Sequence, residues 1–333
     1  VVARTGAAHH ALELGQLRFG RMSGQRVLVG DDLRRAHTAH RRAGQHAGHD
    51  GVGLMHRQQA RAARVVEVGL DGGHEAGAHL HADRAQREGR QEAARIADAA
   101  CVARAFASPV DAVVHLASVP GGAAEEQPAL ARDVNLHGTL HLLEAAEAQA
   151  AAGGPAPRFV FASSIAVLGA PLPAPVDDAA PPLPAMTYGA HKLMGEIAVA
   201  DCSRRGGCDG VSLRLPGVLA RPPQPTGQLS AFLSDLLREP PAGRAVVCPM
   251  GPQAATWASS VHNVVDNLLH ACDVAAARLP AGRALTLPTL RFTMAELVDA
   301  LAAVHGAGVR EFVTFAPQPR IEALFGRFPP LRT

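Results

Sequence analysis

Hydrophobic and polar positions follow a regular pattern only from about residue 96 onward. Short apolar runs, bounded by Gly, Pro or Ser, predict buried strands at 110–117, 157–164 and 210–216. Longer stretches rich in Ala and Leu predict helices at 96–106, 127–149 and 188–201. Strands that alternate with helices form parallel sheets through right-handed crossovers, so we expect an α/β fold with a doubly wound parallel sheet.

After residue 220 the pattern becomes looser. It predicts a short strand at 245–248 and helices at 229–238, within 257–271 and at 293–305. Thr293 and Glu296 have the spacing of a capping box at the start of the last helix. We therefore expect a catalytic portion at 96–220 and a smaller substrate-binding lobe at 221–333, interleaved with the core.

Residues 1–95 form a third part, which we expect to be irregular. Short apolar runs at 26–30 and 64–70 are separated by His, Arg, Gln and Gly without a helical or strand period. The segment holds 15 Arg against 10 acidic residues, whereas the remaining residues hold 17 basic and 20 acidic residues. Ten of the 17 histidines fall within the first 81 residues.

Three interpretations of this segment remain open. A metal site is one, but its histidines lack a supporting Cys or a clear helix face; they are His37, His40, His46, His49 and His56. A basic nucleic-acid tail is another, but Phe19 is the only aromatic residue there. The third, which we favour, is an out-of-frame translation of a GC-rich gene.

The whole-chain composition narrows the class of protein. Hydrophobic residues make up 47% of the chain and aromatic ones 4%, which indicates a globular core built from Ala, Val and Leu. No apolar run approaches the roughly 18 residues of a membrane span, and the start lacks the order of a signal peptide. The cysteines are odd in number and dispersed, which predicts neither disulfides nor a zinc site. We expect a cytoplasmic protein without a metal, a nucleic-acid partner or a membrane partner.

Tyr188 and Lys192 are the only tyrosine and the only lysine in the chain, and they lie four residues apart in a predicted helix. Residues i and i+4 share one helix face, where an ammonium favours the phenolate and lowers the tyrosine pKa. Lys and Arg are not interchangeable in this role. The pair therefore predicts a general acid/base with a tuning lysine. The competing interpretation is a core tyrosine and a surface lysine on one amphipathic helix.

Several motifs, in order, resemble the extended short-chain dehydrogenase/reductase family of NAD-dependent epimerases and dehydratases. They are HLAS (115–118), NLHGT (135–139), FVFASSIAVLG (159–169), YGAHK (188–192) and LRLPG (213–217). Within that family, residues 203–210, 213–243 and 257–271 resemble the D-erythronate dehydrogenases and their sugar-acid relatives. The resemblance implies a Rossmann-like fold, an NAD cofactor and a sugar-acid substrate.

The resemblance also implies roles for single residues. Tyr188 is expected to be the catalytic acid/base, and Lys192 is expected to hold the nicotinamide ribose and lower the tyrosine pKa. Ser164 is expected to bind the reacting oxygen, with Ser163 as the fallback. Asn135 matches a helix asparagine that helps to arrange the site, although it could be an ordinary mid-helix residue.

The cofactor and the substrate are expected to meet further residues. The resemblance places Leu116, Ala117 and Ser118 along the cofactor path, and Leu215, Pro216 and Gly217 near the nicotinamide. An acidic substrate needs a cation, for which Arg221 or Arg238 in the second lobe is a candidate. Hydride then passes from substrate carbon to cofactor while Tyr188 takes the hydroxyl proton.

The chain departs from the family in the expected phosphate-binding turn. No G-x-x-G-x-x-G occurs in residues 1–95; Thr5-Gly-Ala-Ala8 resembles its start, but His9 follows where glycine is needed. Arg95 stands where the family has an adenine-binding Asp. The residues that would bind the phosphates and adenine of the cofactor therefore cannot be assigned from the sequence, and NADP stays an alternative to NAD.

Several hypotheses about function therefore stay open. A sugar-acid dehydrogenase leads, and a nucleotide-sugar epimerase is the runner-up. A 4,6-dehydratase is less favoured because Ile165-Ala166 replace its Asp-Glu pair. A non-catalytic NAD(P)-binding relative and a basic DNA- or metal-binding protein represent other classes. The family leads us to expect a homodimer through helices 127–149 and 188–201.

Overall fold

The computed structural model describes residues 65–68, 96–169, 171–177, 179–219 and 229–332. The interpretations of the histidine cluster, the basic tail and the reading frame lie outside the described residues. One of the two apolar runs noted in segment 1–95, residues 64–70, contains the strand β1 (Val65–Val68).

A parallel sheet forms the centre of the fold, with the strand order β1-β2-β3-β5-β9. Its further strands are β2 (Ala112–His115), β3 (Arg158–Ser164), β5 (Asp209–Leu215) and β9 (Ala284–Thr286). Successive strand residues point to opposite faces. Val113 and Phe159 accordingly pack with one hydrophobic cluster, and Val114 and Val160 pack with another.

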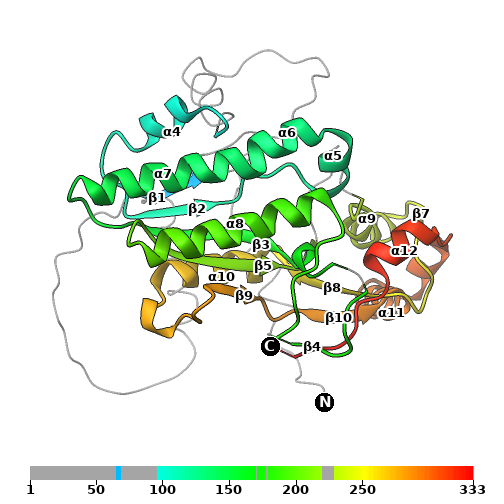
Figure 1. Ribbon diagram of the computed structural model, residues 1–333. Coiled ribbons are helices and arrows are strands. Elements are labelled where there is room, and N and C mark those ends of the chain that lie inside the picture. Colours follow the sequence, from blue (N-terminus) through cyan, green and yellow to red (C-terminus); the bar gives the residue numbers. More distant parts are fainter. Residues whose placement is uncertain (1–64, 69–95, 170, 178, 220–228, 333) are drawn as a thin grey trace, which may run out of the picture.

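Helices cover both faces of this sheet (Figure 1). On one face lie α4 (Ala99–Ala105), α7 (Gly138–Ala151) and α8 (Thr187–Arg204), and the cluster between them and the sheet includes Leu142 and Val199. On the other face lies α10 (Val261–Asp273), which packs on β3 and β5. The predicted doubly wound, Rossmann-like α/β fold is confirmed.

The element that was predicted as one helix at 127–149 is divided. It consists of α6 (Pro128–Arg132), a π-helical stretch η2 (Asp133–His137) and α7, and it follows α5 (Gly121–Glu126). Such π-helical segments are rare and often occur at functional sites. Here the widened turn carries Asn135, which lies buried against the loop after β2.

The C-terminal part forms a smaller lobe beyond the carboxyl ends of the main strands (Figure 1). One sheet has three strands in the order β10 (Leu290–Thr293), β8 (Ala255–Ser260) and β6 (Gly217–Leu219). In a second, two-stranded sheet β11 (Val313–Phe315) pairs with β7 (Val246–Cys248). In a third, β12 (Leu331–Arg332) pairs with β4 (Val176–Asp177). Its helices are α9 (Phe232–Arg238), α11 (Met294–His305) and α12 (Pro319–Phe325). The predicted capping box of Thr293 and Glu296 is confirmed.

The remaining sequence expectations concern membranes, metals and thiols. Within the described ranges, no helix combines the length and apolar character that a membrane crossing needs. The same residues contain no group of His, Cys, Asp and Glu arranged to hold a metal ion. All five cysteines are free thiols, and Cys202 and Cys208 lie beside one another in the core.

Candidate active site

The start of α8 brings Tyr188 to the carboxyl edge of the sheet. α8 follows a Pro-rich loop and begins at Thr187. Its first turn packs on the 3-10 turn Ile165–Leu168, which continues β3. Contact is so close that a Cβ on Gly189 would overlap the carbonyl group of Ala166. A glycine next to Tyr188 therefore sets the position of the phenol relative to β3.

Two serine hydroxyls influence the pKa of the Tyr188 phenol. One is Ser118, three residues after the end of β2, and the other is Ser164, the last residue of β3. Burial raises the pKa of Tyr188 above its usual value, and the hydrogen bonds with Ser118 and Ser164 act against this rise. A phenol at a sheet edge with two hydroxyls acting on its pKa is suited to exchange a proton with a bound molecule.

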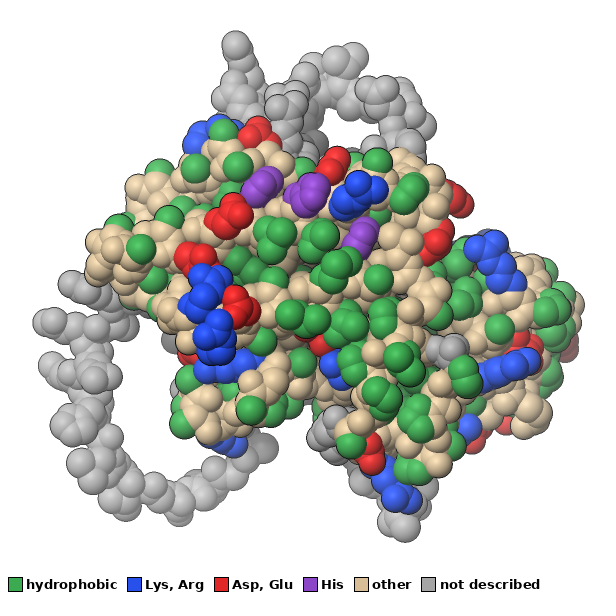
Figure 2. Space-filling view, in the orientation of Figure 1, with side chains coloured by type: hydrophobic (Ala, Val, Ile, Leu, Met, Phe, Trp, Pro, Cys, Tyr) green, Lys and Arg blue, Asp and Glu red, His purple; other side chains and the backbone are tan. Residues whose placement is uncertain are grey.

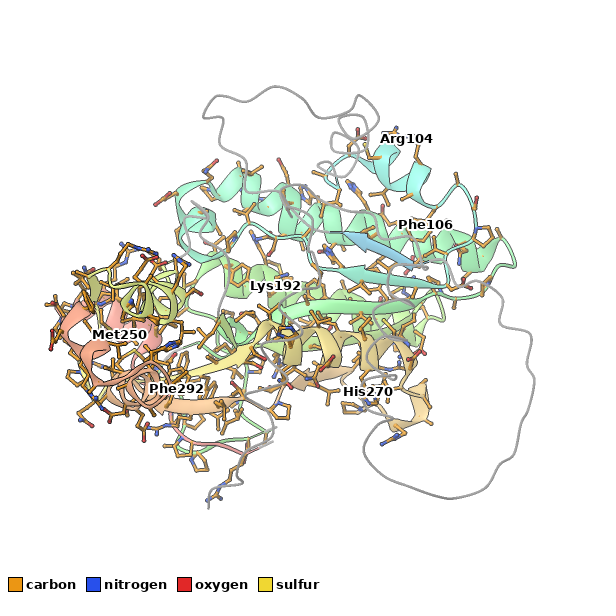
Figure 3. The ribbon with its side chains drawn as sticks, turned by 180° about the vertical axis from the view of Figure 1, so that it is seen from behind. Arg104, Phe106, Lys192, Met250, His270 and Phe292 are labelled. Atoms are coloured by element: carbon orange, nitrogen blue, oxygen red, sulfur yellow. The ribbon has the colours of Figure 1, made fainter. Side chains whose placement is uncertain are left out.

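Lys192 lies one helical turn further along α8, and its side chain is only 2% exposed. Its Nζ donates a hydrogen bond to the Ala162 carbonyl oxygen at 2.7 Å and lies 4.7 Å from the ring centroid of Phe161. Figure 3 shows Lys192 in the interior, on the side of the sheet toward the lobe of Met250 and Phe292. Burial lowers the pKa of Lys192 to about 7.

The relation between Lys192 and Tyr188 differs from the sequence expectation. The lysine was expected to lower the tyrosine pKa, whereas the pKa of Tyr188 is raised. The physical reason is that burial disfavours the charged form of both groups. The Lys192 Nζ lies 5.7 Å from the centroid of the tyrosine ring and donates to a carbonyl on β3.

The two neighbouring serines at the end of β3 have different partners. Ser163 is 2% exposed, and its hydroxyl donates to Glu196 at 2.5 Å. Arg214 on β5 donates to the same carboxylate through Nε at 2.9 Å and Nη2 at 2.8 Å. Ser164 instead faces Tyr188. Of the two serines, the structure thus brings Ser164 and not the fallback Ser163 to the phenol.

Asn135 holds the backbone of the loop after β2. Its side chain accepts from the Val119 N–H at 2.6 Å and donates to the Val119 carbonyl at 2.9 Å. Val119 directly follows Ser118, so this pair of bonds fixes the residue beside a partner of Tyr188. The contact explains why a buried amide stands in the middle of a helical stretch.

A buried histidine continues this network. Thr139 donates to the Asn135 carbonyl at 2.8 Å, and His115 Nε2 lies 2.8 Å from the Thr139 hydroxyl. Since the threonine proton is already donated, Nε2 carries the histidine proton. Burial, and then the charge of Lys192, keep the pKa of His115 well below its usual value. The imidazole is therefore a neutral structural group.

The residues expected to line a cofactor path lie at the carboxyl ends of neighbouring strands. Leu116, Ala117 and Ser118 follow β2, and Leu215, Pro216 and Gly217 connect β5 to β6. In parallel sheets a ligand binds beyond these ends. Lys192 has one acceptor among the described residues, the Ala162 carbonyl, so two of its three N–H donors are available. The residues present fit the ribose and nicotinamide half of a dinucleotide.

Of the two expected substrate cations, the structure describes only Arg238. Arg221 lies outside the described residues. Arg238 lies on α9, where its guanidinium pairs with Asp235 and with Glu239 at 2.8 Å. Ser164 and Tyr188 are therefore the expected substrate residues that the structure brings together.

Two contacts at the site were not anticipated from the sequence. One is the effect of the Ser118 hydroxyl on the pKa of Tyr188. The other is the bond from the Thr187 N–H to the Glu125 carboxylate at 2.6 Å. The sequence had placed Ser118 near the cofactor and so indicated that it belongs to the site. Nothing in the sequence singled out Glu125.

The chain is similar to known enzymes over most of its length. Residues 44–281 match the NAD dependent epimerase/dehydratase family. The chain is 37% identical to the D-erythronate dehydrogenase of Cupriavidus necator over 234 residues, which cover 70% of this chain and 71% of that protein. It is 33% identical to the D-erythronate dehydrogenase of Haemophilus influenzae over 219 residues, 66% of this chain and 68% of that protein.

A solved structure shows the same arrangement. The crystal structure of the nucleoside-diphosphate-sugar epimerase from Agrobacterium tumefaciens superposes with a TM-score of 0.67 at 32% identity, covering 72% of this chain and 70% of that one. Fold and matches together define an enzyme of the extended short-chain dehydrogenase type. The chain belongs to the NAD dependent epimerase/dehydratase family, and the match begins at residue 44, upstream of β1.

Proposed function

We propose that the chain is an NAD-dependent dehydrogenase that oxidises a hydroxyl group of a small sugar acid of the D-erythronate kind. The family match and the two D-erythronate dehydrogenases support the reaction and the substrate class. The observation that carries the proposal is the convergence of Tyr188, Ser164 and Lys192 at the carboxyl edge of the sheet. NADP is the alternative cofactor.

In this proposal Tyr188 removes the proton from the substrate hydroxyl. Ser164 donates a hydrogen bond to the same oxygen, which keeps that oxygen in place as it becomes a carbonyl. A bound nicotinamide cofactor would supply the redox chemistry as the acceptor of the hydride that leaves the substrate carbon. Lys192 would hold the ribose of that cofactor through its two available N–H donors.

The proton transfer is helped by the hydroxyl groups around the phenol. A buried phenolate is disfavoured, and hydrogen bonds to the charged form offset part of that cost. Ser118 and Ser164 both act in this direction on Tyr188. We expect turnover in the oxidation direction to rise with pH, because the phenolate is the form that accepts the proton.

A nucleotide-sugar epimerase is the second candidate function. It is favoured by the likeness to the nucleoside-diphosphate-sugar epimerase from Agrobacterium tumefaciens, since the same tyrosine could serve a reversible oxidation. The two candidates differ in net reaction. A dehydrogenase produces reduced cofactor in proportion to substrate, whereas an epimerase produces none on balance.

We further propose a homodimer formed through the outer faces of α7 and α8, in the cytoplasm. Hydrophobic side chains gather over these helices in Figure 2. Ile197 is 62% exposed and Met194 is 40% exposed, both on α8. Free thiols at all five cysteines suit a reducing compartment.

A substrate panel tests the proposed reaction. The full chain is supplied with NAD⁺ or NADP⁺ and either D-erythronate, its stereoisomers or a UDP-hexose, and reduced cofactor is followed by absorbance. Stoichiometric reduction with a sugar acid supports the dehydrogenase. Interconversion of UDP-hexoses without net reduction would support the epimerase instead, and binding without either reaction would support the non-catalytic relative.

A further inference from the structure

The aromatic ring of Phe161 on β3 lies against the buried ammonium of Lys192. The Lys192 Nζ is placed over this ring, 4.7 Å from its centroid, and both side chains are almost wholly buried. A cation within about 6 Å of an aromatic centroid is attracted by the negative face of the ring, most strongly where water is excluded. The ring of Phe161 therefore gives the charge of Lys192 a favourable surface in the interior.

A glycine on α8 allows the ring to take this position. Gly195 lies three residues after Lys192 on the same helix. A Cβ on Gly195 would lie 2.6 Å from Cζ and 2.8 Å from Cε1 of Phe161, which is closer than these atoms can approach. Glycine is otherwise disfavoured in the interior of a helix. Because Gly195 has no side chain, the ring of Phe161 packs directly against α8 in the turn next to Lys192.

Lys192 has no ionic partner in the part of the chain that the structure describes. Its Nζ donates to the Ala162 carbonyl oxygen at 2.7 Å. Glu196, one turn further along α8, instead accepts from Ser163 and forms an ion pair with Arg214. A buried charge without an ionic partner is costly. The aromatic contact therefore matters more for this ammonium than it would at the surface.

The other titratable groups around Lys192 do not neutralise its charge. Tyr188 on α8 has a raised pKa, and His115 on β2 has a pKa well below its usual value, so both side chains are neutral. The titratable residues of α5, α6 and η2 act on the neighbouring His191; they are Glu125, Arg132 and His137. Glu147 on α7 pairs with Arg205. The pKa of Lys192 therefore depends on its burial and on its contacts with β3.

We propose that Phe161 is a positioning residue of the candidate active site: the face of its ring stabilises the ammonium of Lys192, and Gly195 admits the ring to that place. The proposal deepens the proposed function, on which it rests, because Lys192 is the residue that would hold the cofactor ribose. The ring favours the charged form of the lysine, so it opposes the effect of burial. Loss of the ring should therefore lower the pKa of Lys192.

The single lysine makes a direct test possible. Carbon-13 lysine incorporated into the full chain gives one Cε signal in NMR, whose chemical shift follows the protonation of Lys192. We expect Phe161→Leu to lower the Lys192 pKa by about one unit, because a desolvated ammonium loses its aromatic partner. Phe159→Leu is the matched control, since Phe159 is equally buried on β3 and packs edge-on to His115. An unchanged pKa in Phe161→Leu, or equal shifts in the two variants, overturns the proposal.

A fluorinated ring tests the charge of the ring face separately from its packing. A phenylalanine with fluorine on both Cδ atoms, introduced at position 161 alone, keeps the shape of the ring. The Cδ atoms are not among the ring atoms nearest to Gly195, so the packing on α8 is preserved. Fluorine withdraws electron density from the ring face, and the Lys192 pKa should fall, by less than in Phe161→Leu. An unchanged pKa in the fluorinated chain overturns the role of the ring face, even if Phe161→Leu lowers the pKa.

This test separates the inference from the proposed function. The titration needs neither cofactor nor substrate, so a chain that turns over no sugar acid still reports whether Phe161 acts on Lys192. An unchanged Lys192 pKa in a chain that oxidises a sugar acid overturns the present inference alone. A lowered pKa in a chain without turnover overturns the proposed function alone. Circular dichroism shows whether each variant keeps its fold, and the fluorinated chain supplies the test if Phe161→Leu does not fold.

Discussion

The hydroxyl of Ser163 donates to the carboxylate of Glu196 at 2.5 Å, and Glu196 lies about two helical turns beyond Tyr188 on α8. Ser164 is the last residue of β3, and its hydroxyl, unlike that of Ser163, acts on the phenol of Tyr188. Glu196 in turn is held by Arg214. The buried ion pair thus assigns one serine to structure and leaves the other for chemistry.

Ser164→Ala and Ser163→Ala should therefore affect different properties: the first should lower the rate of catalysis, and the second should lower the stability of the fold. Removing Ser164 should lower kcat by about 10²-fold, as expected for loss of one oxyanion donor, with little change in stability. Removing Ser163 should lower the free energy of unfolding by about 1–2 kcal/mol, because a buried carboxylate loses a donor. Steady-state kinetics and urea unfolding distinguish the two; a larger kinetic loss in Ser163→Ala would contradict the assignment.

Lys192 should make stability depend on pH. Its pKa is about 7 in the folded chain, below its usual 10.5. Between these values the unfolded chain binds more protons, so stability rises with pH, by at most about 1.4 kcal/mol per pH unit from this group. We expect the slope between pH 7 and 9 to be smaller in Lys192→Met. Equal slopes in chemical unfolding would show that Lys192 is not titrating abnormally.

Gly189→Ala should damage the site although alanine favours helices. The added Cβ would overlap the backbone of Ala166, so the first turn of α8 must move away from β3. We expect kcat to fall by about 10-fold or more, since small misplacements of reacting groups are costly. Ala190→Gly, the neighbouring change of opposite helix propensity, serves as the control. If Gly189→Ala retained full kcat, close packing at this turn would not position Tyr188.

Ile197→Glu tests the proposed dimer face. A charge on a residue that is 62% exposed should leave the fold intact but disrupt an apolar interface. We expect light scattering to show a dimer for the unmodified chain and a monomer for this variant. Val304→Glu, at a 75% exposed residue on α11, is the matched control and should remain dimeric. Two monomeric species, or two dimeric ones, would argue against this face.

The sheet and the helix carrying Tyr188 could be predicted because their apolar periods are strong. The strand predicted at 157–164 is observed at Arg158–Ser164, and the helix predicted at 188–201 is observed at Thr187–Arg204. The short strand β9 was missed, since three residues provide too little pattern. The division of the helix at 127–149 was also missed, because a π-helical turn leaves the apolar spacing almost unchanged.

The sequence was sufficient to predict which residues form the candidate site, but not which contacts these residues make. Tyr188, Lys192 and Ser164 were expected and lie together, yet burial raises the tyrosine pKa, which the sequence led us to expect to be lowered. The Glu125 bond joins residues 62 positions apart. No local pattern carries information about such a pair, so it emerges only when α5 packs on α8.

Tyr188→Phe tests the central claim most directly. The variant keeps the ring and removes only the hydroxyl, so the fold should persist while proton transfer is lost. With D-erythronate and NAD⁺ in excess, we expect the unmodified chain to form NADH and the variant to form it about 10²–10⁴ times more slowly. Equal rates in the two proteins would show that Tyr188 is not the acid/base of this reaction.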